Sequence, residues 1–169
     1  MTRFVALIGG IGAATHARMS MADLRAGCEA AGLVAVRTLL ATGNLGFEAE
    51  GPEAAHDAVA GVLAAHGVER PVVLRAAAAL PRLLARNPFP EAAAERPDRL
   101  LVHYLPAPWS GPAPEWDGPE RIALRGREVF VDYARGVGRS KLTGAALARL
   151  AGPGGTARNW NTSQKLCDI

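Results

Sequence analysis

The sequence predicts an α+β protein made of two ferredoxin-like halves, with the order β-α-β-β-α-β in the first half. Two observations predict this class. Short apolar runs alternate with segments of helical periodicity over residues 1–76, and a weakened form of the same order returns after residue 99. We therefore expect an N-terminal half at 1–76, a connecting helix and proline-rich linker at 77–99, and a C-terminal half with basic motifs at 100–169.

The first half begins with the apolar run at residues 4–8, which is typical of a buried strand. Ser20 and Asp23 have the spacing of a capping box and predict the start of a helix, which Gly32 ends. On that helix Cys28 falls on the apolar face, so we interpret it as a core thiol. The remaining predicted elements are a hairpin of strands at 33–39 and 45–49, a helix at 53–66 and a strand at 72–74.

The second half is predicted to be a degenerate copy of the first. A short helix near residues 80–86 has to end before Pro88, because a residue that precedes proline is driven out of helical geometry. The proline-rich stretch from Pro106 to Pro119 stands where the first helix of the copy should be. The predicted elements are strands at 100–104, 121–124 and 128–133 and a helix at 142–150, followed by residues 156–162 and a short tail.

Composition excludes several classes of protein. Hydrophobic residues make up 49% of the chain, which excludes disorder, and no 18-residue apolar run exists that could span a membrane. Cys28 and Cys167 lie far apart in the sequence without a Cys/His cluster, so we expect neither a disulfide framework nor a structural zinc site. We also expect no cofactor and no other metal. A reducing cytoplasm is the expected location, and a secretory signal is disfavoured because glycines break the N-terminal apolar run.

Charge is distributed unevenly. The formal net charge is +3. Residues 1–120 hold 10 basic and 13 acidic side chains, whereas residues 121–169 hold 9 basic and 3 acidic side chains. The last third is therefore a basic segment, which favours an anionic partner there.

The clearest motif runs from Gly136 to Thr143, between a strand and a helix. A glycine-rich turn at a helix start can point backbone amides at an anion, and Arg139, Ser140, Lys141 and Thr143 add donors. This is not a Walker motif, because the glycine and hydroxyl neighbours of the lysine are missing. Alternatively, Ser140 is the helix N-cap and the two cations are solvated.

A second motif surrounds Trp160 and precedes Lys165. Arg158, Asn159 and Asn161 supply polar groups beside a flat ring, a combination that suits a base or another flat ligand. Alternatively, the indole fills core space and the asparagines bond to local backbone.

Other groups give weaker signals. His16 is the histidine we would test as an acid or base, and His103 is expected to pack within a strand. Trp109 and Trp116 lie in the proline-rich stretch, where we expect a lid over the core or a contact between copies of the chain.

Seven motifs taken in order resemble those of a bacterial family, domain-of-unknown-function family 1697. They are residues 4–8 with the following glycine-rich loop, 21–25, 36–38, 43–44, 87–89, 138–143 and 158–162. The resemblance covers nearly the whole chain and implies two ferredoxin-like halves, but it implies no established activity.

The chain also departs from the family. Members usually carry arginine at the position of Gly9, asparagine at that of Gly12, and glutamine-serine in place of Ala41-Thr42. The resemblance therefore implies that the N-terminal polar cluster is missing here. Either this site is inactive, or it is specialised for a less polar ligand.

We expect first a cytoplasmic protein that binds a phosphate-bearing ligand, nucleotide or nucleic acid, through its basic C-terminal half, although nothing in the sequence establishes nucleic acid as the partner. A second hypothesis is a small-molecule enzyme with a more apolar cleft, in which Thr42, Asn44, His16 and Tyr133 are the polar groups. A third is a scaffold that forms homo-oligomers through the segment of Trp109 and Trp116. No pair of residues specifies a reaction.

Overall fold

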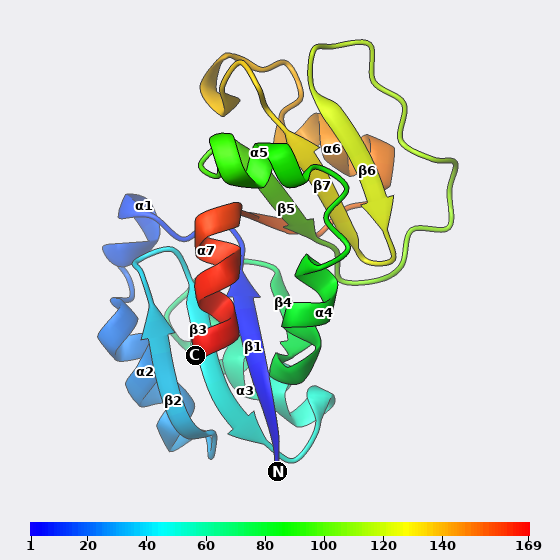
Figure 1. The fold of residues 1–169 in the computed structure, drawn as a ribbon. Coiled ribbons are helices and arrows are strands. Elements are labelled where there is room, and N and C mark those ends of the chain that lie inside the picture. The colour runs from blue at the N-terminus through cyan, green and yellow to red at the C-terminus, as the bar shows by residue number, and fades with distance from the viewer. The chain divides into compact units, whose positions relative to one another are not determined.

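The computed structural model describes all residues, 1–169, and divides them into two compact units (Figure 1). Residues 1–80 and 166–169 form the first unit, and residues 81–165 form the second. Each unit holds a four-stranded antiparallel sheet with helices, which confirms the α+β class and the two ferredoxin-like halves. The expected linker at 77–99 is split at Leu80, and the last four residues belong to the first unit.

The first unit has the sheet order β2-β3-β1-β4. Its elements are β1 (Thr2–Ile8), α1 (Ala13–His16), α2 (Met21–Ala30), β2 (Val34–Leu39), β3 (Asn44–Ala49), α3 (Pro52–Ala65), β4 (Val72–Ala76) and a 3₁₀ turn (Ala77–Ala79), with a second 3₁₀ turn (Leu166–Asp168) at the end of the chain. Helix α4 (Leu80–Leu84) spans the division between the units.

Helices α2 and α3 pack on one face of the first sheet. Ser20 caps α2 by accepting a hydrogen bond from the Asp23 amide, and Asp23 completes the predicted capping box. Leu24 and Cys28 of α2 are both fully buried in the core cluster, together with Val59 of α3. The prediction that Cys28 is a core thiol is therefore confirmed, and burial raises its pKa to about 11.

The second unit repeats this strand order as β6-β7-β5-β8. Its elements are α5 (Pro90–Glu95), β5 (Leu100–Tyr104), β6 (Arg121–Arg125), β7 (Glu128–Asp132), a 3₁₀ turn (Val137–Arg139), α6 (Gly144–Ala151), β8 (Thr156–Asn159) and α7 (Trp160–Lys165). Two helices correct the expectation: α5 lies in the supposed proline-rich linker, where Pro90 occupies the first helical turn, and α7 lies in the supposed tail.

As predicted, a proline-rich connection stands in place of a helix between the first two strands of the copy. The chain between β5 and β6 has no helix, and Trp109 and Trp116 from this segment pack instead against the core cluster that α6 covers. A proline-rich stretch cannot continue a helix, because proline lacks the amide donor and clashes with the preceding turn. Both indoles are thus half-buried within their own unit.

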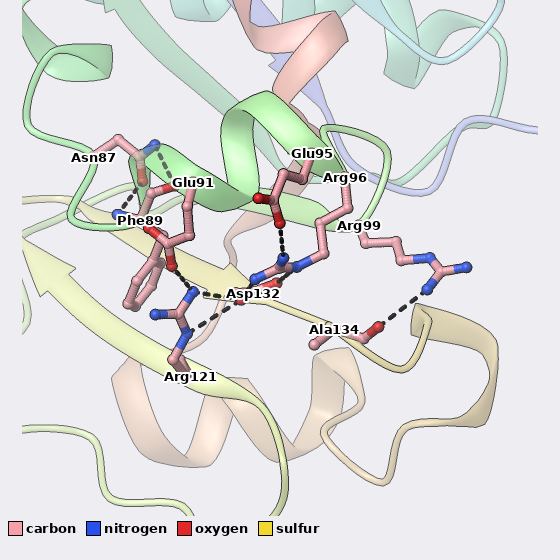
Figure 2. A network of polar contacts seen from close by, with 9 residues as sticks. All are labelled: Asn87, Phe89, Glu91, Glu95, Arg96, Arg99, Arg121, Asp132 and Ala134. Atoms are coloured by element: carbon pink, nitrogen blue, oxygen red, sulfur yellow. Dashed lines mark hydrogen bonds and ion pairs between the residues drawn. The ribbon is translucent and has the colours of Figure 1, made fainter.

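Helix α5 is fastened to the sheet by an ion-pair network around Asp132 (Figure 2). Asp132 accepts two hydrogen bonds from Arg96, at 2.9 and 2.6 Å, and two from Arg121, at 3.1 and 2.7 Å. Arg121 also pairs with Glu91 of α5 and lies 4.4 Å from the centre of the Phe89 ring. The network is satisfied within the unit, so we interpret it as structural.

None of the helices combines the length and the apolar character needed to cross a bilayer.

Candidate functional site

A cavity of about 1010 Å³ opens in the second unit between two loop segments and the end of α6. The first segment is the end of the proline-rich stretch, and the second is the predicted glycine-rich anion motif. The lining residues are Glu115, Trp116, Asp117, Gly118, Pro119, Glu120, Arg135, Gly136, Arg139, Ser140, Lys141 and Leu150. We call this cavity the second-unit groove.

One wall of the groove is cationic. Arg135, Arg139 and Lys141 are exposed, and none of them forms a hydrogen bond or an ion pair within the chain. Gly136 has φ +95°, a conformation that glycine adopts without strain, and it turns the chain out of β7 toward the 3₁₀ turn. Three unpaired cations therefore border one cavity.

Glu120 connects this wall to the opposite one. Its Oε1 accepts a hydrogen bond from the Ser140 hydroxyl, and its Oε2 accepts one from Trp116 Nε1 at 2.7 Å. Glu120 is only 9% exposed. Burial raises the pKa of this carboxyl group, but the hydrogen bonds from Ser140 and Trp116 and the nearby charge of Arg135 outweigh burial and lower it. Glu120 is therefore ionised at neutral pH.

Ser140 is not the helix N-cap. Thr143 takes that place: its hydroxyl accepts a hydrogen bond from the Ala146 amide at 3.2 Å at the start of α6. Ser140 instead accepts from the Leu142 amide at 2.9 Å while donating to Glu120. Thr143 is thus a structural cap and is not among the groove's lining residues.

The other wall carries acidic and apolar groups. Glu115 and Asp117 are exposed and border the groove, so the lining holds three carboxylates and three cations. The indole of Trp116 and the side chain of Leu150 supply apolar surface, and both are half-buried. The groove therefore combines cationic, anionic and apolar surface.

The second predicted motif, around Trp160, lies outside this groove. Arg158 is 8% exposed and donates to Thr156 Oγ1 at 2.7 Å and to the Ala157 carbonyl at 2.8 Å. Burial lowers the pKa of its guanidinium group to about 10. Asn159 accepts from the Thr162 amide at 2.9 Å, where α7 starts, while Trp160 is half-buried and Asn161 exposed.

The N-terminal candidates meet at the turn between β2 and β3 in the first unit. His16, at the end of α1, places Nε2 2.8 Å from the Ala41 carbonyl oxygen. Asn44 is fully buried and donates to the Leu39 carbonyl at 2.9 Å and to Thr42 Oγ1 at 3.1 Å. These bonds stabilise the turn.

Tyr133, a candidate for the alternative enzyme function, is buried beneath α6. Its hydroxyl donates to the Leu142 carbonyl at 2.9 Å, and burial raises its pKa to about 12. A phenol in this environment stays protonated at neutral pH, so it lacks the pKa of a general base.

Sequence reasoning missed Glu120 and the network around Asp132. Glu120 follows Pro119 directly and carries no local pattern that sets it apart from the other acidic residues. For the network, the Asn-Pro-Phe sequence at 87–89 was a usable signal. Asn87 accepts a hydrogen bond from the Phe89 amide and donates one to the Phe89 carbonyl, which forms an Asx turn just before α5. The motif at 87–89 thus positions the helix that holds Glu91.

The comparisons agree with the fold. The model of a family described as "Protein of unknown function (DUF1697)" matches residues 1–130. A solved structure titled as the conserved bacterial protein SP0830 from Streptococcus pneumoniae is 17% identical, covers 99% of this chain and 97% of its own, and superposes with a TM-score of 0.72. No protein with a curated description matches. The family match spans more than half of the sequence, and the chain belongs to the DUF1697 family.

Proposed function

We propose that the second-unit groove binds a small phosphate-bearing molecule. The observation that carries the proposal is the cationic wall: Arg135, Arg139 and Lys141 form no hydrogen bond or ion pair within the chain and border one cavity. Phosphate oxygens accept hydrogen bonds from arginine and lysine, and arginine adds a bidentate geometry. The indole of Trp116 gives the rest of the ligand an apolar surface.

The opposite wall favours a small ligand over nucleic acid. Glu115 and Asp117 would repel a polymer whose phosphates continue beyond the cationic wall. A single phosphate can approach the cations without running past the carboxylates. The proposal is therefore a nucleotide or a phosphorylated metabolite, bound as a single molecule.

The test is a thermal-shift screen of nucleotides, phosphorylated metabolites and short oligonucleotides at low and high salt, followed by calorimetric titration of the best ligand. A molecule that binds only the folded chain raises its melting temperature. We expect a nucleotide or metabolite to bind with a shallow dependence on salt. Binding of oligonucleotides with a steep dependence would instead support a polymer, because many phosphate contacts release many counterions.

Variants then locate the site. Arg139→Ala and Lys141→Ala should each weaken binding about tenfold, the effect of losing one hydrogen bond to a charged group. Arg149→Ala is the matched control, because Arg149 is an exposed arginine on α6 that does not line the groove. Unchanged affinity in both groove variants would refute the proposed phosphate position.

A further inference from the structure

Glu120 stands where the donors of the proposed phosphate site converge. Its carboxylate is the acceptor for the Ser140 hydroxyl at the centre of the glycine-rich motif, and it lies in the field of Arg135. It is the most deeply buried of the three carboxylates that line the groove. A carboxylate and a phosphate accept hydrogen bonds from the same donors. The chain thus supplies its own anion to this motif.

We infer that Glu120 is an internal competitor that an incoming phosphate must displace from Ser140, so that binding at the groove also releases Trp116. This inference rests on the proposed function and adds a mechanism of control to it. Two anions cannot share one hydroxyl donor, and their charges repel each other at close range. When the carboxylate moves, the hydrogen bond to Trp116 Nε1 breaks with the one to Ser140.

The released indole belongs to the segment that replaces the missing helix. Trp116 packs against the core cluster beneath α6, and its bond to Glu120 is the polar contact that holds this end of the proline-rich segment beside the basic motif. Ligand binding would therefore be reported by the Trp116 indole. Trp109 Nε1 donates to the Pro112 carbonyl, and neither Trp109 nor Trp160 lines the groove, so their indoles serve as internal references.

The experiment titrates ¹⁵N-labelled protein with inorganic phosphate and follows the three indole N–H signals by NMR, with Trp116→Phe identifying one of them. Glu120→Gln removes the negative charge and replaces one of the two acceptor oxygens by an NH₂ donor, so Ser140 and Trp116 no longer each have a carboxylate oxygen of their own. We expect this variant to bind phosphate about tenfold more tightly than the wild type. In the wild type, the Trp116 signal alone should move as phosphate is added.

Glu115→Gln is the control for charge. Glu115 lines the same groove, and this substitution removes the same negative charge, but the carboxylate that bonds to Ser140 and Trp116 is that of Glu120. Its effect on phosphate affinity should be smaller than that of Glu120→Gln, because water screens the charge of an exposed residue. Trp116→Phe removes one of the two donors that hold the carboxylate without changing any charge, and should tighten phosphate binding about threefold.

The outcomes separate the inference from the proposed function. If the wild type binds phosphate and Glu120→Gln binds it no more tightly than Glu115→Gln does, displacement is refuted while the phosphate site stands. If neither the wild type nor any variant binds phosphate, both fail. Binding by Glu120→Gln alone would support the inference directly. Thermal unfolding of each variant confirms that the chain is folded during the titration.

Discussion

Removing the carboxylate of Asp132 should destabilise the second unit substantially. The side chain is 1% exposed and receives four hydrogen bonds from two arginines. Deleting one partner of a buried ion pair costs about 3–5 kcal/mol, because the remaining charge loses its compensation. Arg96 and Arg121 are 24% and 46% exposed, so water can hydrate them in part, and we expect Asp132→Asn to lower the free energy of unfolding by about 2–3 kcal/mol.

Urea denaturation and thermal melting measure this effect. In a chain of this size, 1 kcal/mol corresponds to about 2–4 °C, so the melting temperature should fall by about 4–12 °C. Glu95→Gln is the control: Glu95 is 70% exposed and lies 3.3 Å from Arg96, and its loss should cost less than about 0.5 kcal/mol. If the two variants were equally stable, the assignment of Asp132 as the anchor of α5 would be refuted.

The same carboxylate has a defined dependence on pH. Arg96 lowers the pKa of Asp132 below its ordinary value of 3.8; burial acts in the opposite direction, and Arg121 lowers the pKa further. A carboxyl group with a lowered folded-state pKa stabilises the fold above its unfolded pKa, and this contribution is lost as pH falls through the folded-state pKa. The stability difference between wild type and Asp132→Asn should therefore be constant above about pH 5 and shrink in more acidic solution. A difference that grew in acid would contradict the assignment.

Three further predictions test the cores. Burial lowers the pKa of His103 to about 4 from 6.5, so below pH 6.5 the unfolded chain binds a proton that the folded chain does not. The free energy of unfolding of the wild type should therefore fall by up to about 3 kcal/mol between pH 7 and pH 4. Urea denaturation at several pH values should show a smaller fall for His103→Leu, and an equal fall in both proteins would contradict the prediction. Gly27→Ala should destabilise the chain by about 1–3 kcal/mol, because the added Cβ would lie 2.6 Å from Val62 Cγ1. Gly61→Ala adds a Cβ in open space on α3 and should stabilise the chain by up to about 1 kcal/mol. Equal shifts in melting temperature for the two variants would contradict this prediction. A thiol reagent at pH 8 should modify Cys28 only after unfolding, and rapid labelling of the native chain there would show that the core opens.

Much of the fold could be predicted because its signals are local. The capping box of Ser20 and Asp23, the apolar runs of the strands and the glycines that end helices all act within a few residues, and the structure has each of them. The two short helices α5 and α7 could not be predicted in this way. Six residues form too few internal hydrogen bonds to be stable alone, so they depend on tertiary contacts such as that between Glu91 and Arg121.

Of the two loop segments that line the groove, only the glycine-rich motif was predicted from the sequence to bind a ligand. The glycine-rich motif supplied Arg139, Ser140 and Lys141, which all line the groove. Glu120 lies 20 residues before Ser140 in the sequence, and only the return of the chain through β6 and β7 brings the two together. Hydrogen-bond partners at that separation leave no periodicity or spacing in the sequence.

The groove follows from what the second unit lacks. In the first unit, α2 covers its part of the sheet with regular helical packing, and Leu24 and Cys28 are fully buried. In the second unit an irregular proline-rich segment takes the corresponding place in the chain, and Trp116 from that segment packs against the core while its neighbours border a cavity of about 1010 Å³. A loop lacks the internal hydrogen bonds of a helix, so it has to be held by specific side-chain contacts, here Trp116 to Glu120 to Ser140. The loss of a helix therefore accounts both for the groove and for the carboxylate that stands in it.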